Sequence, residues 1–227
     1  MTITTAGVPG SGMIMSTTGG LQVSPTRSTL TLSCVSSSCN LKCAGESSCQ
    51  DLSMEENIWA IECEKFSCKG LTARCPKGQS CSAICNGISA CRGAVFYGKW
   101  QVACEGISSC QDVTILEISQ PITCRGVSSC QGLSATCTKG RHCTVICHGV
   151  SACQRARFEG KWNPICNGVS SCQNLALQES AESITCLSVS SCEGLTAHCG
   201  EGKSCSAVCT TVSACRGAIL YGQWNID

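Results

Sequence analysis

The sequence predicts an all-β protein: a parallel β-solenoid (β-helix) of about nine 19–23-residue coils in three 62-residue repeats, stapled by disulfides. Three observations predict this fold. Cysteine supplies 26 of the 227 residues, while the aromatics number only 4 Trp, 2 Tyr and 3 Phe. The cysteines fall into close pairs of nearly constant spacing, and the pairs recur within a longer sequence repeat. Such a composition is typical of a chain that uses disulfides in place of a large apolar core.

The thirteen cysteine pairs are the constant unit of the sequence, since eleven read C-x5-C and two read C-x4-C. In chain order, the predicted disulfide residues are Cys34 and Cys39, Cys43 and Cys49, Cys63 and Cys68, Cys75 and Cys81, Cys85 and Cys91, Cys104 and Cys110, Cys124 and Cys130, Cys137 and Cys143, Cys147 and Cys153, Cys166 and Cys172, Cys186 and Cys192, Cys199 and Cys205, and Cys209 and Cys215.

Two disulfide connectivities are compatible with this spacing. A bridge needs Cα atoms about 4.4–6.8 Å apart, whereas residues i and i+6 of an extended strand lie about 20 Å apart. A pair that closes on itself therefore reverses the chain within five residues, and the intervening Gly and Ser suit such a bend. Alternatively, equivalent cysteines of adjacent coils, about 4.8 Å apart, could form a ladder of bridges. The constant spacing favours bridges within each pair.

A longer repeat lies over the cysteine pairs. Residues 43–103, 104–165 and 166–227 align end to end, and each divides into three segments that resemble one another. A segment of this length cannot bury an apolar face alone, so it becomes stable by stacking on similar neighbours. No apolar stripe of helical period exceeds two turns, so few helices are expected. Nine stacked coils predict a rod about 43 Å long.

The domain organisation follows from where the cysteines begin. Residues 1–33 contain none and are rich in Thr, Ser and Gly, so we expect a flexible N-terminal arm and cap. Within it, residues 29–32 alternate like a strand that begins the cap or first coil. Residues 34–227 form the predicted cysteine-rich solenoid. Three tandem cysteine-rich domains, or a threefold-symmetric all-β fold, are alternatives, and the internal triplet of coils argues against both.

The C-x5-C motif, as in CNGVSSC at 166–172, resembles that of the beetle-type antifreeze proteins. Those are short-coil β-helices with a disulfide across each coil, so the resemblance implies a disulfide-stapled β-helix. It covers only this local spacing. The ice-binding face of that family is a Thr-x-Thr column, and here T-x-T occurs at 2–4 and 29–31, outside the repeats, and once within them at 136–138, so it forms no column. The coils are also longer than those of the family.

The cysteine content also predicts the compartment. So many disulfides need an oxidising environment, which favours an extracellular or virion location, although no signal peptide is visible at the N-terminus. No apolar run reaches the roughly 20 residues of a membrane span. A net charge of +1 gives no reason to expect a nucleic-acid partner.

Metal binding and catalysis are not expected. The sequence has no C-x-x-C and only three histidines, so neither a metal site nor a cofactor is expected. Asp51 and Asp112 share one repeat position, which Asn174 takes in the third repeat, and a solvated turn cap explains them better than an acid–base pair. We therefore expect a protein that is not an enzyme.

One aromatic motif recurs once in each long repeat, near its end. Gly-Lys-Trp or Gly-Gln-Trp places Trp100, Trp162 and Trp224 at equivalent positions. Large apolar residues precede them, namely Phe96, Phe158 and Leu220. Two interpretations remain open. The large side chains fill a wider coil, or they form a spaced column that contacts a partner subunit or a glycan.

These observations lead us to expect a non-enzymatic structural protein. A rigid disulfide-rich rod suits a component of a virion or extracellular assembly, with other protein subunits as partners in a homo- or hetero-assembly. An open last coil exposes strand edges, so a covering subunit is expected there. A glycan- or surface-binding adhesion module that uses the Trp/Phe column is the first alternative, and an ice-binding protein is the second.

Overall fold

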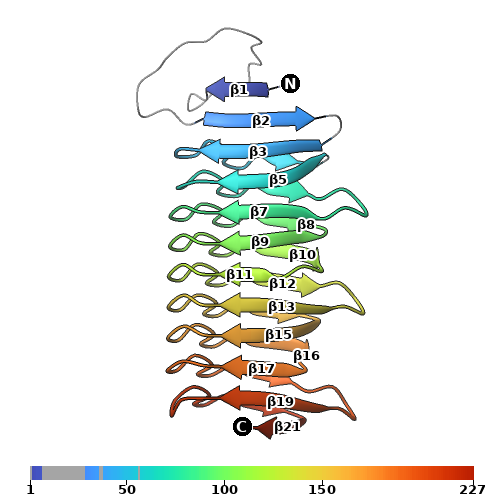
Figure 1. The fold of residues 1–227 in the computed structure, drawn as a ribbon, viewed down its shortest axis with the longest axis vertical. Coiled ribbons are helices and arrows are strands. Elements are labelled where there is room, and N and C mark those ends of the chain that lie inside the picture. The colour runs from blue at the N-terminus through green and yellow to red at the C-terminus, as the bar shows by residue number, and fades with distance from the viewer. Residues whose placement is uncertain (1, 7–28, 36–37, 56) are drawn as a thin grey trace.

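The chain folds as a long stack of parallel coils (Figure 1). The computed structural model describes residues 2–6, 29–35, 38–55 and 57–227, and this part of the chain is all β, without a helix. The predicted parallel β-solenoid of about nine coils is confirmed. The termini lie at opposite ends of the rod. Most of the predicted flexible arm, residues 7–28, lies outside the described residues.

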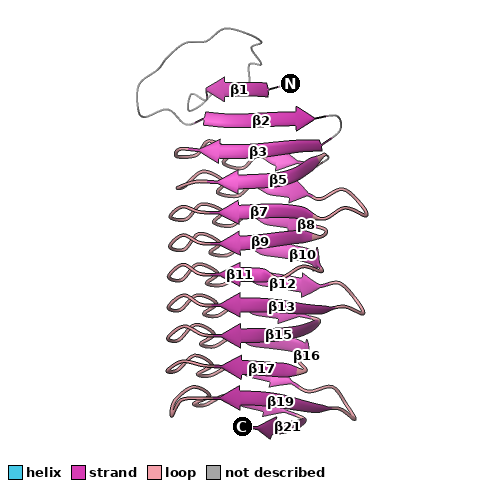
Figure 2. Cartoon of the chain, in the orientation of Figure 1, coloured by secondary structure: helices cyan, strands magenta, loops and turns pink. Residues whose placement is uncertain are grey.

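Two sheets run the length of the rod (Figure 2). The long sheet has twelve strands: β1 (Thr2–Ala6), β2 (Thr29–Val35), β3 (Ser38–Ala44), β5 (Ile58–Cys63), β7 (Cys81–Cys85), β9 (Trp100–Cys104), β11 (Ile122–Cys124), β13 (His142–Cys147), β15 (Lys161–Cys166), β17 (Ser183–Cys186), β19 (Ser204–Cys209) and β21 (Gln223–Ile226). The short sheet has nine: β4 (Ser53–Met54), β6 (Thr72–Arg74), β8 (Val95–Tyr97), β10 (Thr114–Ile118), β12 (Ser134–Cys137), β14 (Arg157–Glu159), β16 (Ala176–Ser180), β18 (Thr196–His198) and β20 (Ile219–Tyr221).

Each coil consists of a long-sheet strand, a disulfide-closed turn, a short-sheet strand and a return segment. The last residue of each long-sheet strand from β5 to β19 is the first cysteine of a pair. These cysteines stack in register: Cys124 pairs with Cys104 on one side and with Cys147 on the other. The turn continues for about two residues beyond the second cysteine, and the bridge closes its first part in every one of these coils.

All thirteen disulfides join the two cysteines of one pair. Bridging within pairs is therefore confirmed, and the ladder between coils is wrong. The Cα atoms of Cys166 and Cys172 lie 5.8 Å apart, within the usual range for a bridge, because the turn reverses the chain. Both sulfurs face the interior, and Cys166 and Cys172 are fully buried.

The N-terminal strands depart from the solenoid pattern. β1 pairs antiparallel with β2, and β2 pairs antiparallel with β3, whereas all the other strand pairs in the two sheets are parallel. Cys34 lies directly opposite Cys39 in the second of these pairs, and their bridge joins β2 to β3. This C-x4-C pair thus belongs to an antiparallel cap on the long sheet. The cap covers the strand edge that the first coil would otherwise expose.

On the side of the rod where each coil returns to the long sheet, the interior is filled by a different group in each of three successive coils. In the second repeat the first coil supplies Ile118, which pairs with Cys137 of the next. The next coil carries the additional Cys137–Cys143 bridge there, and Cys143 pairs with Trp162 of the third. An aliphatic side chain, a disulfide and an indole thus occupy successive layers. The 62-residue repeat is the period of this filling.

The turns stack so closely that one position excludes a Cβ atom. Gly106, Gly126, Gly149 and Gly168 occupy equivalent positions two residues after the first cysteine of their turns. A Cβ added to any of them would collide with the backbone of the equivalent glycine in the preceding coil. Backbone carbonyls cannot move aside without breaking the ladder, so glycine is favoured by packing in these four coils, whereas the coil of Ser188 accommodates a Cβ at this position.

We predict that Gly126→Ala destabilises the rod by about 1–3 kcal/mol, because the methyl group overpacks against the Gly106 carbonyl. The matched control is Ser188→Ala, since Ser188 holds the same position in a later coil and already carries a Cβ. Guanidinium unfolding with the disulfides intact, followed by circular dichroism, measures both. Equal stability of the two variants would contradict close stacking of the turns.

Candidate functional site

A row of apolar side chains runs along the outside of the disulfide-closed turns, and we call it the turn ridge. Its seven members lie three residues after the first cysteine of successive turns: Ile88, Ile107, Val127, Val150, Val169, Val189 and Val212. They are exposed by 40–55%, except Val212 in the last coil, which is fully exposed. An uninterrupted apolar row of this length is unusual on a soluble protein surface.

The backbone of the turn forces these side chains outward. The serine after each ridge residue from Ile88 to Val189 has a positive φ, 51° in Ser108, so the chain bends sharply there. In the coils from Ile88 to Val169 the N–H of this serine donates to the carbonyl of the ridge residue in the next coil, as Ser108 does to Val127 at 2.9 Å. The repeated bond keeps the ridge straight and in register along the rod.

The ridge has polar but mostly neutral flanks. One flank carries a ladder of glutamine amides, in which Gln131 Nε2 donates to Gln154 Oε1 at 3.1 Å and Gln154 Nε2 donates to Gln173 Oε1 at 2.6 Å. The other flank carries Glu105 and Arg125, whose charged groups lie 3.8 Å apart. Neither flank concentrates charge of one sign beside the middle of the ridge.

The second coil, just before the start of the ridge, has no ridge residue because its turn is one residue shorter, C-x4-C between Cys63 and Cys68. In this turn Phe66 makes both of the hydrogen bonds that the ridge residue and the serine after it make in the regular turns. Its carbonyl accepts from Ser47 N–H and its own N–H donates to the Ile88 carbonyl, both at 3.0 Å. Phe66 has the left-handed φ, 55°, that serine has in the regular turns. The ridge position of this coil is therefore missing.

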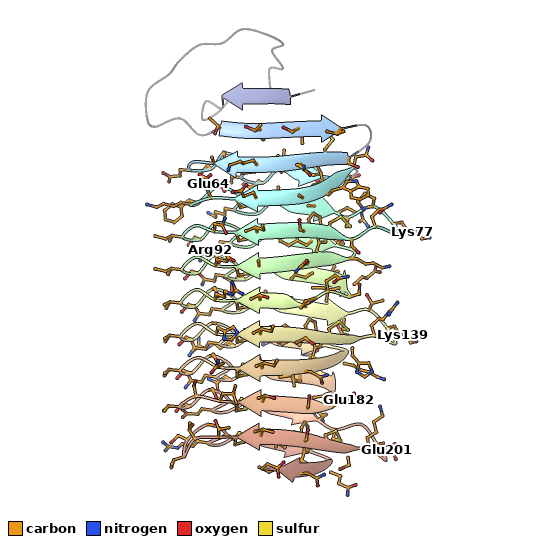
Figure 3. All side chains as sticks on the ribbon, in the orientation of Figure 1. Glu64, Lys77, Arg92, Lys139, Glu182 and Glu201 are labelled. Atoms are coloured by element: carbon orange, nitrogen blue, oxygen red, sulfur yellow. A yellow bond between two sulfur atoms is a disulfide. The ribbon has the colours of Figure 1, made fainter. Side chains whose placement is uncertain are left out.

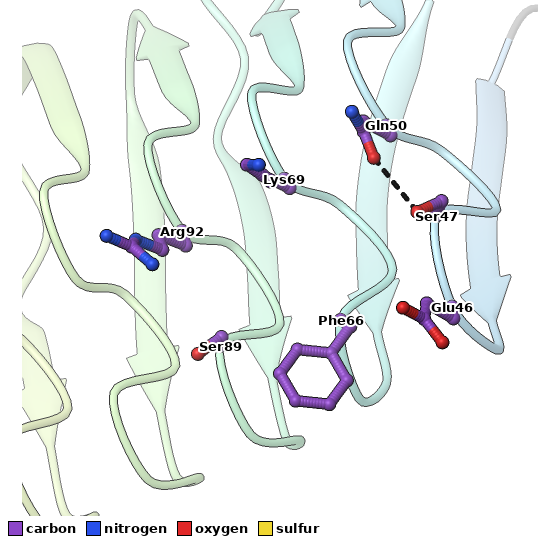
Figure 4. A pocket seen from close by; sticks show the side chains of 7 residues that line it. All are labelled: Glu46, Ser47, Gln50, Phe66, Lys69, Ser89 and Arg92. Carbon is purple, nitrogen blue, oxygen red and sulfur yellow. Dashed lines mark hydrogen bonds between the residues drawn. The ribbon is translucent and has the colours of Figure 1, made fainter.

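The missing position leaves a hollow of about 270 Å³, which we call the notch (Figure 4). Its lining comes from the first three turns: Glu46, Ser47, Gln50, Phe66, Lys69, Ser89 and Arg92. Figure 4 shows Gln50, Lys69 and Arg92 along one rim and Glu46, Phe66 and Ser89 along the other. Phe66 is 37% exposed. Sequence analysis missed this site, although the C-x4-C spacing marks it.

The aromatic column is interior. Phe96, Trp100, Phe158 and Trp162 are fully buried, and each phenyl ring packs on its indole, at 5.2 Å and 4.6 Å between ring centroids. The interpretation of these four residues as a partner-binding column is therefore wrong, because they fill the wider coil. The indole N–H of Trp162 donates to the carbonyl of Glu159 at 2.9 Å.

Only the last coil leaves part of the column accessible. Leu220 and Trp224 are partly exposed, since no described coil covers them from the C-terminal side. The indole N–H of Trp224 still donates to the Tyr221 carbonyl at 2.9 Å, as its equivalents do in the earlier repeats. Contact of Leu220 and Trp224 with a partner stays a prediction.

The two aspartates lie at bends of the turns. Asp51 and Asp112 have positive φ values of 54° and 58°, as Asn174 has at 56°. Each side chain lies over a glycine of the next coil, Asp51 over Gly70 for example, where a Cβ would collide with the carboxylate. Their position thus fits the expected turn cap.

The outer face of the long sheet carries a mixed column. In register from β7 to β19 its members are Ile84, Ala103, Thr123, Ile146, Ile165, Thr185 and Val208. The regular threonine pair that defines the ice face of the antifreeze family is absent from these strands.

Charged side chains lie at the margins of the rod, where Figure 3 labels Lys77, Lys139 and Glu201. Lys42 donates to Glu62 at 3.2 Å, and this hydrogen bond raises the pKa of Lys42 above its usual value. His142 Nδ1 and Glu182 Oε2 lie 3.3 Å apart on the return side. Exposed pairs of this kind contribute little to stability.

Some cysteine sulfurs gather closely enough to suggest a metal site, such as those of Cys104, Cys124 and Cys130, within 4.8 Å of one another. Metal ions bind the thiolate form of cysteine. Each of these sulfurs is bonded in a disulfide, and no cysteine of the described chain is free. The clusters reflect the stacking of bridges.

Comparison with known proteins finds no matching family model, no matching curated protein and no matching solved structure. In the part of the chain that the structure describes, no helix is long and apolar enough to cross a membrane.

We predict that Trp162→Ala lowers the free energy of unfolding by about 3–5 kcal/mol, the usual cost of removing a fully buried indole. Trp224→Ala is the matched control, and we expect a smaller loss because Trp224 is partly exposed. Denaturant unfolding of the oxidised chain measures both. A loss for Trp224→Ala as large as that for Trp162→Ala would contradict the filling role.

We predict that the unreduced chain weighs about 26 Da less than the reduced chain, because each of the thirteen bridges removes two hydrogens. Intact-mass spectrometry measures the difference. Digestion without reduction should release Cys166 and Cys172 on a mutually linked fragment. A fragment that joins Cys147 to Cys166 would contradict the connectivity.

Proposed function

We propose that the protein is a non-enzymatic structural rod that packs side by side with other copies of itself in an extracellular or virion assembly. The turn ridge is the observation that carries this proposal. A solenoid stapled in every coil supplies the stiffness, and the ridge supplies a repeated apolar contact along its length. The oxidising location rests on the disulfide content.

The size of the ridge sets the expected strength of association. The seven Val and Ile side chains of the ridge expose on the order of 500 Å² per copy, compared with about 800 Å² per partner in a typical stable interface, and the antiparallel contact described below brings together the four from Ile88 to Val150. A single ridge contact is therefore weak, and association should depend on protein concentration. Several contacts along neighbouring rods would add to a stable assembly.

The charges beside the ridge favour antiparallel packing of two copies. Consider a two-fold axis perpendicular to the ridge, between the turns of Glu105 and Arg125. It places Glu105 of each copy opposite Arg125 of the other. The same axis places Gln111 opposite Gln131. No like charges meet at the centre of this contact, and β-branched side chains lose little rotamer freedom when they pack.

We predict that Val127→Lys combined with Val150→Lys weakens self-association at least tenfold, because each lysine would bury a charge against an apolar ridge. Sedimentation velocity from micromolar to millimolar protein measures it. The matched control is Thr144→Lys, on the outer face of the long sheet in the coil of Val150, and it should associate as the unmodified chain does. An unmodified chain that stays monomeric throughout this range would overturn the proposal.

A charge exchange tests the orientation separately. Glu105→Lys alone should weaken association, since it places two positive charges across the two-fold axis. Adding Arg125→Glu should restore it among copies that all carry both changes. If the double variant associates no better than Glu105→Lys, the antiparallel arrangement is wrong.

A further inference from the structure

We propose that the notch binds an anionic saccharide, with one sugar ring on Phe66 and its carboxylate or sulfate group held by Lys69 and Arg92. The notch lies at the N-terminal end of the turn ridge, and in the antiparallel pair proposed above it faces the turns of Val169 and Val189 of the second copy, so saccharide binding is measured on the monomer. Three features of the notch support the proposal: its aromatic floor, its two cations, which form no ion pair among the described residues, and its hydrogen-bonding rim.

The aromatic floor is unusual in its backbone. A left-handed φ is rare for a bulky residue, and strained residues cluster at binding sites. The shortened turn imposes this conformation on Phe66 and leaves the residue 37% exposed, with Lys65 Nζ over its ring at 5.4 Å from the centroid. An exposed ring beside a hollow provides an apolar face for the C–H groups of a pyranose.

Lys69 and Arg92 occupy a turn position that carries a neutral amide in several later coils. Gln50, Lys69 and Arg92 lie one residue after the second cysteine of successive turns, and four later turns carry glutamine there. Neither Lys69 nor Arg92 takes part in an ion pair among the described residues. Guanidinium and ammonium groups on adjacent coils form a suitable pair for one carboxylate or sulfate.

The rest of the rim suits sugar hydroxyls. Ser47 and Ser89 offer hydroxyl groups and Gln50 offers an amide. Ser47 Oγ donates to Gln50 Oε1 at 2.9 Å, which orients that amide (Figure 4). The volume of about 270 Å³ lies just below the usual range of ligand sites, about 300–1,000 Å³. The notch therefore accommodates one ring and leaves the rest of a chain outside.

Isothermal titration of the oxidised full chain, at a concentration where it is monomeric, tests the proposal. The probes are three hexasaccharides: sulfated uronic acid, unsulfated uronic acid and neutral glucose. We expect one or both acidic probes to bind, and the neutral probe to bind at least tenfold more weakly. Binding of the sulfated probe alone would identify sulfate as the recognised group, and binding of both would identify carboxylate as sufficient. Failure of both acidic probes to bind would overturn the proposal.

Variants locate the binding. Lys69→Gln combined with Arg92→Gln installs the amides of the later coils, and we expect at least a tenfold loss of affinity. Arg216→Gln is the matched control, because Arg216 holds the same turn position in the last coil, away from the notch. An equal loss with Arg216→Gln, or no loss with the double variant, would show diffuse charge attraction and overturn the assignment.

A second variant removes the notch and keeps the cations. Inserting one valine after Lys65 together with Phe66→Ser restores the regular C-x5-C turn and the missing ridge residue. We expect this chain to fold with all its bridges, which intact mass measures, and to lose saccharide binding at least tenfold. Unchanged binding by this chain would exclude the notch as the site.

Discussion

The in-register stacking of one disulfide-closed turn on the next is the constraint on which the whole rod depends. The first cysteine of each turn lies in register with the equivalent cysteine of the neighbouring coils, as Cys124 does with Cys104 and Cys147. The bridge then brings the chain back within six residues. Closing so short a loop lowers the entropy of the unfolded chain by an amount equivalent to roughly 2 kcal/mol per bridge in the chain-entropy model. The bridges compensate for a core that has few large side chains.

The same stacking determines the outer surface. Because every turn follows the same path, a residue type repeated at one turn position becomes a continuous row on the rod. The ridge residue, the glutamine and the close-packed glycine each form such a row. A surface row in a solenoid is thus specified by the repeat, and its length grows with the number of coils.

The sequence was sufficient to predict the fold class and the coil length and to favour disulfides within each cysteine pair, because all three rest on spacing. It was not sufficient to say which repeated residues face outward. Val127 and Trp162 both recur and both are apolar, yet one is half-exposed and the other is buried. The difference arises from the left-handed serine after Val127 and from the Cys137–Cys143 bridge beside Trp162. Neither the positive φ nor the layer of that bridge is visible in the spacing.

The two cysteine pairs that depart from the regular spacing mark features that the repeat itself does not specify. Only two of the thirteen pairs have the shorter C-x4-C spacing. The Cys34–Cys39 bridge joins the antiparallel strands that cap the long sheet, and the Cys63–Cys68 bridge closes the turn that lacks its ridge residue. In a strictly periodic rod every coil offers the same surface, so a single distinct site requires a local change in the period. A one-residue deletion suffices, since it moves Phe66 into the left-handed position and opens the surface between its neighbours. Irregular cysteine spacing is therefore the sequence signal to follow when a distinct site is sought in such a solenoid.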